Sequence, residues 1–189
     1  MKLNDVIRTR RQALGLTQEQ LCDGICEPMT LSRLENGKQT PSRNRINALL
    51  QRLGLPDDRY FALLSKNELE MEALQKEIVA CNANHRVEEG FETLKKFEQI
   101  ADHDDQIAQQ FILRSKVLLG RLDQRYTPQE QIDLLMQAIR LTVPRFNLDE
   151  IERFFYSTDE IKIINQIGIA YSDDGQNKKA ADIYYQLLK

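Results

Sequence analysis

A stretch near the N-terminus, residues 24–38 with the sequence GICEPMTLSRLENGK, carries side chains whose types and spacing suit the reading of DNA bases. On a helix that buries Leu31 and Leu34, the outward-facing residues are Met29, Thr30, Ser32 and Arg33. An arginine can donate two hydrogen bonds to a guanine edge, a threonine or methionine can touch a thymine methyl group, and a serine both donates and accepts. We therefore predict that these four residues read base edges in a major groove.

Backbone phosphates need other partners, and neighbouring residues supply them. Gln18 falls in the first turn of the preceding predicted helix, where unpaired backbone N–H groups favour an anion. The other candidates to contact phosphate are Lys38, Ser42, Arg43 and Arg45. Such contacts position a protein on the duplex without reading its sequence. Scattered arginines alone would indicate an ordinary solvated face, so this prediction depends on the helix pattern around them.

Local start and stop signals define the helices that must position these side chains. The predicted helices of this head end at Gly15, run from Thr17 to Cys22, from Pro28 to Asn36 and from Ser42 to Leu53, and finish with a short helix over 60–64. The break at Asp23-Gly24 joins the second helix to the third. Two helices joined by a tight glycine-containing turn are the outline of a helix-turn-helix.

From residue 67 onward, helical patterns alternate with short polar joints and no strand pattern is found. The expected helices span 67–82, 86–101, 105–122, 128–143, 148–155, 158–173 and 176–189. Ser157, followed three residues later by Glu160, fits a capping box. The predicted fold class is all-α, with a five-helix DNA-binding head over residues 1–65 and a helical body over residues 66–189.

The last two predicted helices have the spacing of a tetratricopeptide repeat. The residues that fit are Ile167, Gly168, Tyr171, Gly175, Ala180 and Tyr184. Leu187 departs from the pattern, which usually has a small residue there. Looser matches in two earlier helix pairs involve Gly90 with Leu94 and Ile132 with Met136. We therefore predict that the body is an α-solenoid of stacked helix pairs.

The segment TQEQLCDGICEPMTLSRLENG, residues 17–37, resembles the Cro-type helix-turn-helix of phage repressors, and the resemblance extends over about residues 4–56. Its turn, residues 23–26, is one residue shorter than usual. Glycine-isoleucine-cysteine at this turn, ahead of tetratricopeptide-like pairs, resembles the Rgg and PlcR group of peptide-pheromone-responsive regulators of Gram-positive bacteria. The resemblance covers the whole chain and implies a lambda-repressor-like head. It also implies a structural ion pair between Arg11 and Glu35.

A curved stack of helix pairs has an inner face, lined by the first helix of each pair, that suits an extended peptide. The repeat register places Lys162, Asn165, Ile169 and Ser172 on that face. Gln110 and Arg114, four residues apart on an earlier first helix, can point the same way. The Asn165 carboxamide can bond both the N–H and the C=O of a peptide backbone, a role that the resemblance also implies. The alternative is an ordinary solvated helix face.

Composition limits the remaining possibilities. Residues 1–65 hold 10 Lys and Arg against 7 Asp and Glu, whereas the rest of the chain holds 16 against 22, so only the head suits a polyanion. No apolar run is long enough for a membrane span or a signal peptide. Three cysteines are too sparse and odd in number for a disulfide scaffold, and we expect a cytoplasmic protein.

Enzymatic chemistry has little support in the sequence. Cys22 and Cys26 lack the second Cys or His pair of a zinc site, and we expect them in the core of the head, with a redox-sensitive thiol as the alternative. His85 and His103 lie at predicted helix joints. No glycine-rich phosphate loop, paired catalytic carboxylates or nucleophile with a base is found. We expect no enzyme activity, no cofactor and no metal.

Together these patterns predict a sequence-specific transcriptional regulator that binds double-stranded DNA as a homodimer and senses a short peptide. The alternatives are a constitutive repressor whose repeats only dimerise, and a repeat-based module that docks another protein. The sequence stops inside the second helix of its best repeat without a polar capping helix. We therefore expect either a fragment of a longer regulator or an end covered by another subunit.

Overall fold

The computed structural model describes residues 3–55 and 66–188, and every regular element in these ranges is a helix. The predicted all-α fold class is confirmed, while the expected helix over 60–64 lies outside the described residues. The described helices of the head are α1 (Leu3–Ala13), α2 (Gln18–Cys22), α3 (Pro28–Glu35) and α4 (Arg43–Arg52). Their inner faces form one core that includes Ile7, Leu21, Leu31, Ile46 and Leu49.

Local sequence explains how the helix-turn-helix begins and turns. The Thr17 hydroxyl accepts from the Gln20 N–H, and the Gln20 amide in turn accepts from the Thr17 N–H, which closes a capping box at α2. Pro28 lies in the first turn of α3, where its missing N–H costs nothing. Between these helices Gly24 has a φ of +73°, a left-handed conformation that glycine adopts without strain.

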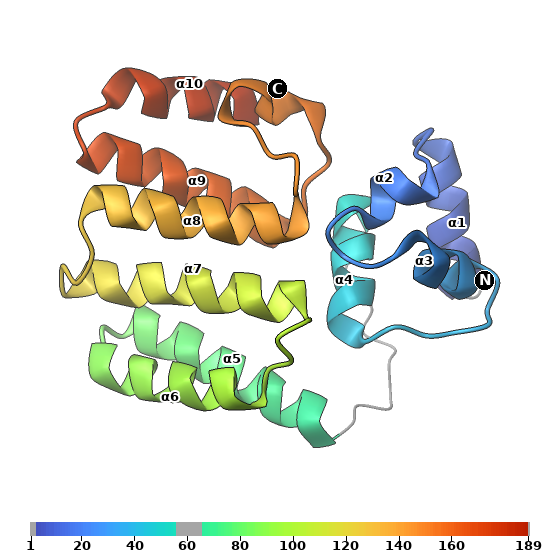
Figure 1. Cartoon of the computed structure of the whole chain (residues 1–189), viewed down its shortest axis with the longest axis horizontal. Helices are drawn as coiled ribbons and strands as arrows, with labels where there is room; N and C mark the ends of the chain where they lie inside the picture. The colour runs from blue at the N-terminus through green and yellow to red at the C-terminus, as the bar shows by residue number, and fades with distance from the viewer. Residues whose placement is uncertain (1–2, 56–65, 189) are drawn as a thin grey trace.

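The body consists of three antiparallel helix pairs that stack side by side (Figure 1). Its elements are α5 (Lys66–Ala83), α6 (Val87–Ile100), α7 (Gln106–Leu122), α8 (Pro128–Thr142), the 3-10 helix η1 (Leu148–Arg153), α9 (Thr158–Asp173) and α10 (Asn177–Leu187). One apolar core lies between α8, α9 and α10, and a second lies between α5, α6 and α7. The predicted capping box of Ser157 and Glu160 is present at the start of α9.

The segment expected to be a helix over 148–155 is instead a short 3-10 helix with a non-helical residue, Glu150, in its middle. Gln186 of α10 explains the difference. Its side chain accepts a hydrogen bond from the Ile151 N–H (2.8 Å) and donates one to the Leu148 carbonyl (2.9 Å). Backbone groups that bond a distant side chain are not available for helical pairing, so the prediction of an α-helix here was wrong.

Close approach within the last helix pair depends on Gly168. A Cβ atom at this position would lie 2.7 Å from the Tyr184 ring, so the α10 tyrosine occupies the space that a side chain would need. Ala180, a second small residue of the pattern, is buried between α9 and α10. These contacts follow the tetratricopeptide-like spacing seen in the sequence.

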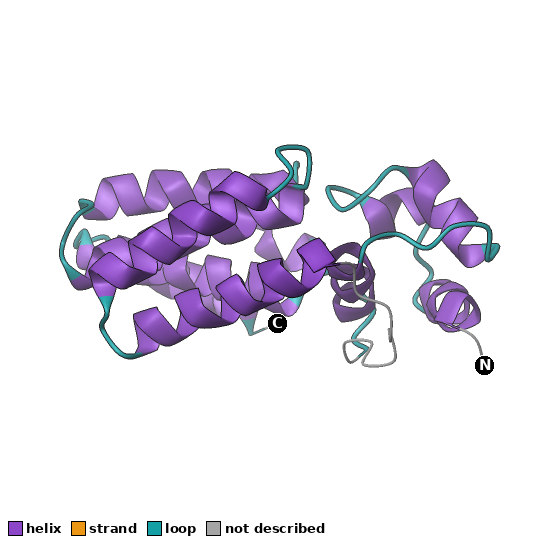
Figure 2. Cartoon of the chain, turned by 90° about the horizontal axis from the view of Figure 1, so that it is seen from below, coloured by secondary structure: helices purple, strands orange, loops and turns teal. Residues whose placement is uncertain are grey.

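The head packs against one side of the helical body. Helix α4 lies on the side of the head that faces the body, and a second view shows the head beside the helical stack (Figures 1 and 2). The turn of the helix-turn-helix lies directly against the body. A Cβ atom on Gly24 would lie only 2.0 Å from the carbonyl oxygen of Thr142, the last residue of α8. This contact leaves no room for any other residue at position 24.

We expect Gly24→Ala to destabilise the joint between head and body more than a left-handed backbone alone explains. Gly15→Ala is the matched control, because Gly15 has a similar φ of +68° but a Cβ atom there would have nothing within 4 Å. The control should lower the free energy of unfolding by about 1–2 kcal/mol, and Gly24→Ala should lower it clearly further. Urea unfolding of both variants measures the difference. Equal losses of unfolding free energy in Gly24→Ala and Gly15→Ala would show that a Cβ atom at position 24 does not collide with Thr142.

Candidate functional site

The outward face of α3 contains the four residues predicted to read bases. Met29 is 64% exposed, Arg33 is exposed, and Thr30 and Ser32 are partly exposed. Leu31 and Leu34 are buried in the head core, as the helix pattern requires. The structure therefore presents the four side chains on one accessible surface, which we call the recognition face.

A buried carboxylate fastens α3 to the rest of the head. Arg11 donates to both oxygens of Glu35, from Nε to Oε1 at 2.6 Å and from Nη2 to Oε2 at 2.9 Å. The Glu35 residue is only 1% exposed. Burial by itself would raise the pKa of Glu35, but hydrogen bonds from Arg11 and Gln18 outweigh it and the pKa is lowered. The pair therefore holds the recognition helix against α1.

Gln18 takes part in the same cluster. Its Nε2 donates to Glu35 Oε2 at 2.7 Å, so the side chain expected to contact phosphate also supports the buried ion pair. One N–H and the carbonyl oxygen of that amide are left for an outside partner. The sequence pattern did not indicate this second contact, because it joins residues 17 positions apart.

The other predicted phosphate contacts are placed differently. Lys38 is exposed beyond the end of α3, and Arg45 is partly exposed on α4. Ser42 precedes α4 but its hydroxyl makes no side-chain cap. Arg43 Nη1 pairs with Glu72 of α5 at 3.1 Å, so this side chain turns toward the body, and its predicted phosphate contact stays a prediction. Glu72 lies in the body, so the sequence of the head alone does not indicate this contact.

Arg52, the last residue of α4, is the hub of the head–body joint and was missed by sequence reasoning. Its Nη1 donates to the carbonyls of Leu21 (3.1 Å) and Asp23 (2.6 Å), at the end of α2. Its Nη2 donates to the Thr142 carbonyl (2.6 Å) at the end of α8 and to Glu160 Oε1 (2.8 Å). Both side chains of the ion pair are almost fully buried.

Glu160 extends this network into α9. Its second oxygen, Oε2, accepts from the Ser157 N–H at 2.6 Å, which is the capping contact predicted from sequence. Thr142 is shared as well, because its hydroxyl accepts from Gln110 Nε2 at 2.6 Å. An unbroken series of hydrogen bonds thus joins the turn of the helix-turn-helix to the N-terminus of α9.

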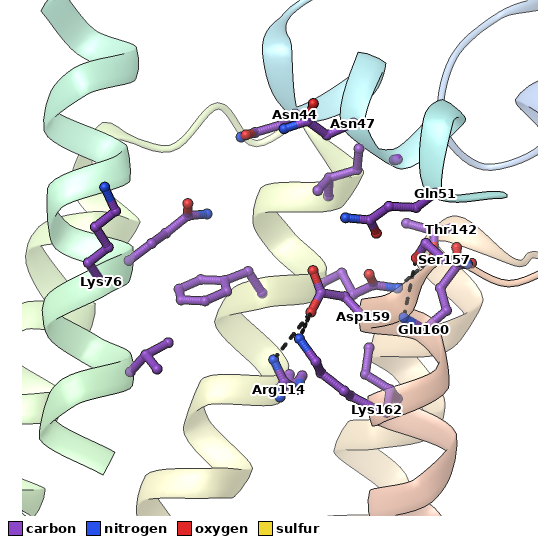
Figure 3. A pocket seen from close by; sticks show the side chains of 17 residues that line it. Asn44, Asn47, Gln51, Lys76, Arg114, Thr142, Ser157, Asp159, Glu160 and Lys162 are labelled. Atoms are coloured by element: carbon purple, nitrogen blue, oxygen red, sulfur yellow. Dashed lines mark hydrogen bonds and ion pairs between the residues drawn. The ribbon is translucent and has the colours of Figure 1, made fainter. Parts of the chain in front are cut away.

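A pocket of about 420 Å³ lies between the head and the face formed by the first helices of the three pairs, α5, α7 and α9 (Figure 3). Helix α4 closes one side with Asn44, Asn47 and Gln51. From the body, Lys76, Arg114 and Lys162 reach the pocket from α5, α7 and α9. The size falls within the range of small-ligand sites, and the lining is rich in amides and cations.

The residues predicted to bind a peptide divide into two groups. Arg114, Gln110 and Lys162 line the pocket. Asn165, Ile169 and Ser172 do not line it; they lie further along α9, and the Ser172 hydroxyl donates to the Asn177 side chain at 3.2 Å.

Gln110 reaches the pocket with its amide group already engaged. It is 5% exposed, and its Nε2 donates to both the Ala138 carbonyl (3.0 Å) and the Thr142 hydroxyl (2.6 Å). Its main contact is therefore structural, between α7 and α8. The spacing of Gln110 and Arg114 on one helix face was visible in the sequence, but the partner of the glutamine on α8 was not.

Cysteines and acidic groups in the described part of the chain do not form a metal site that the structure supports. Cys22 and Cys26 pack in the head core, as expected. The ligand atoms of Glu77, Cys81 and Glu89 lie close together, yet Arg86 pairs with both glutamates at 3.0 and 2.7 Å. A guanidinium already supplies the positive charge that a metal ion would bring. Within the described residues, none of the helices is both long and apolar enough to span a bilayer.

Comparisons with known proteins agree with this geometry. Residues 3–60 match the helix-turn-helix domain family. The crystal structure of Bacillus thuringiensis PlcR in complex with the peptide PapR7 and DNA has a similar fold, with a TM-score of 0.52 and 21% sequence identity. The match covers 99% of this chain and 64% of that one, so the chain spans less than two thirds of the PlcR length. No curated protein matches the sequence significantly.

These findings confirm the predicted resemblance for the fold: a helix-turn-helix head followed by a helical region like that of PlcR. The family match identifies a helix-turn-helix domain over residues 3–60, and the structural match extends the similarity of fold to the helical body. The individual contacts to bases, phosphates and peptide stay predictions, as does the domain boundary at residue 65.

The buried Glu35 carboxylate, bonded by Arg11 and Gln18, should make the free energy of unfolding depend on pH in the acidic range. Because folding lowers the pKa of Glu35, its stabilising contribution is complete above the ordinary glutamate range and is lost as the pH falls toward the lowered value. Glu35→Gln should cost about 3 kcal/mol at neutral pH and should weaken the acid dependence. Urea unfolding from about pH 7 to about pH 3 tests this. Glu92→Gln, at an exposed site on α6, is the control, and equal pH profiles for Glu35→Gln and wild type would contradict the prediction.

Proposed function

We propose that this protein is a sequence-specific transcriptional regulator in which α3 enters the major groove of double-stranded DNA. The observation that carries the proposal is the recognition face: Met29, Thr30, Ser32 and Arg33 are accessible together, on a helix fixed from behind by the Arg11–Glu35 pair. A rigid helix that presents donors, acceptors and methyl groups is what base reading requires. Lys38, Arg45 and the Gln18 amide would contact the backbone on either side.

The proposed active species is a homodimer. A single α3 spans one short half-site, whereas two heads related by a two-fold axis read a pseudo-palindrome in successive major grooves. Tyr185 of α10 and Leu188, which follows that helix, are 66% and 87% exposed and offer apolar surface for association. Burying such side chains against another chain would remove apolar surface from water.

The effector that we propose is a short peptide, bound in the pocket between α4 and the first helices of the body. The comparison protein was crystallised with both a peptide and DNA. Here Asn44, Asn47 and Gln51 belong to the head, while Arg114 and Lys162 belong to the body. A ligand in this pocket would therefore contact both parts at once, and its binding would favour one relative placement of head and body.

The Arg52 network would carry that preference to the DNA-binding surface. Asp159 and Lys162, which line the pocket, follow Ser157 in the first turns of α9. The same helix holds Glu160, which pairs with Arg52, and Arg52 holds the turn that precedes α3. A shift of α9 would thus change the partners of the turn that sets the direction of the recognition helix.

DNA binding can be tested by selecting bound sequences from random duplexes with the full chain, followed by salt titration of the selected site. We expect a pseudo-palindrome, with affinity that falls steeply as salt rises. Arg33→Ala should cost about 1–3 kcal/mol and relax the preference at one base pair of each half-site, whereas Lys38→Ala should weaken all sequences and reduce the salt slope by about one.

Arg140→Ala is the matched control, because Arg140 is an exposed arginine of α8 on the body. It should bind like wild type. If operator binding were indifferent to both Arg33→Ala and Gln18→Ala, α3 would not be the reading helix. Absence of any selected sequence at low salt would favour the alternative of a repeat-based module that docks another protein. Selection of a site by a protein that responds to no peptide would favour a constitutive repressor.

The head–body joint can be tested by a double-mutant cycle on Arg52→Met and Glu160→Gln. Each single change leaves a buried polar partner behind and should cost about 3–5 kcal/mol, whereas the double variant should cost clearly less than the sum. The free energy of unfolding in urea is the measurement. The exposed pair Arg153–Glu150 provides the control cycle, with an expected coupling of about 0.5 kcal/mol or less. Additive losses for Arg52 and Glu160 would contradict a joint held by this pair.

A further inference from the structure

The pocket between head and body has an excess of positive charge. The charged side chains that line it are Lys76, Arg114, Asp159, Glu160 and Lys162. Two of them are matched by residues outside the lining: Lys76 by Glu72 at 2.7 Å, and Glu160 by Arg52 at 2.8 Å. Asp159 is then the carboxylate that remains in the lining for both Arg114 and Lys162.

Lys162 makes the closer of the two contacts with Asp159. Its Nζ lies 3.0 Å from Asp159 Oδ1, and the two side chains are each about half exposed. Arg114 Nη1 lies 3.8 Å from the same oxygen, which is beyond hydrogen-bond distance. Figure 3 shows both cations converging on this carboxylate from α7 and α9. The single exposed carboxylate of Asp159 is therefore the counter-ion of two cationic side chains, Arg114 and Lys162.

Arg114 is poorly satisfied for a buried cation. Its side chain is 16% exposed, and its Nε is buried without a hydrogen-bond partner among the described residues. Burial lowers the pKa of Arg114, the direction expected when a charged group loses water without a close counter-ion. The Nε of Arg52 is unpaired as well, but the two terminal nitrogens of that buried guanidinium make four hydrogen bonds. Among the described residues, Arg114 therefore lacks the close partners that Arg52 has.

We propose that Arg114, supported by Lys162, is the anchor for a carboxylate of the peptide effector, supplied either by its C-terminus or by an aspartate or glutamate side chain. This inference rests on the proposed peptide-sensing function and names the chemical class of the ligand. A planar guanidinium binds a carboxylate through two parallel hydrogen bonds, a geometry that also fixes the direction of the ligand. Asn44, across the pocket on α4, can bond the peptide backbone that follows.

Four pools of synthetic heptapeptides separate the two sources of the carboxylate. Their C-termini are free or amidated, and their sequences contain or lack aspartate and glutamate. Each pool is passed over the immobilised full chain, and retained peptides are identified by mass spectrometry. We expect retention from pools that offer a carboxylate and at least tenfold less from the amidated pool that lacks acids, since hydrogen bonds to charged groups are the strong ones. The better-retained single-source pool identifies the source.

The same pools are then tested on three arginine variants of α7. Arg114→Gln should reduce retention about tenfold or more, and Arg114→Lys should restore part of it. Arg121→Gln is the matched control, because Arg121 lies on the same helix and pairs with Asp173 instead of lining the pocket. It should retain peptides like wild type. Thermal unfolding of each variant establishes that it is folded. If Arg114→Gln does not fold, the comparison of the four pools on the wild-type protein decides whether a carboxylate is required.

The outcomes separate the two levels of the proposal. Equal retention of peptides with and without carboxylates, or retention by folded Arg114→Gln equal to wild type, would overturn the carboxylate anchor and leave peptide sensing standing. Retention of no peptide from any pool by wild type would overturn peptide sensing, and the anchor with it.

Discussion

The buried guanidinium of Arg52 is the interaction on which the arrangement of this molecule depends. The C-terminal ends of α2 and α8 both point their last carbonyls at it, and the N-terminal turn of α9 supplies Glu160. Helix C-termini carry partial negative charge and N-termini carry partial positive charge, so a cation and an anion at these ends are each favourably placed. Four helices, α2, α4, α8 and α9, are thus joined through one guanidinium, next to the close approach of Gly24 to Thr142.

The joint also explains why the pocket has walls from both head and body. Helix α4 ends at Arg52, and its earlier residues Asn44 and Asn47 face the pocket because its last residue is fixed to α8 and α9. On the other side, α9 begins with the capping box that contains Glu160. The same two helices, α4 and α9, therefore form both the joint and part of the pocket wall. A ligand that contacts both can act on the joint without any separate path through the protein.

Most helix ends could be predicted from the sequence, because caps and glycines act locally: Thr17, Ser157 and Gly24 each indicate their own turn. The recognition face followed from the spacing of Leu31 and Leu34. Long-range partners could not be predicted in this way. The capping box predicted from sequence accounts for one oxygen of Glu160. The other oxygen accepts from Arg52, which lies 108 positions away in the sequence, and that contact could not be predicted. The pair of Arg43 with Glu72 and the 3-10 form of η1 were not predicted for the same reason, because Glu72 and Gln186 are distant in sequence from the segments that they contact.

The two buried glutamates among the described residues have different roles. Glu35 joins α1 to α3 inside the head, where a third group, Gln18, completes its bonding and the recognition helix is held as part of one rigid unit. Glu160 joins the body to the head, and its partner Arg52 is equally enclosed. A desolvated pair of this kind resists gradual loosening, because partial separation leaves two charges with neither each other nor water. The joint therefore favours the closed arrangement over a partly separated one.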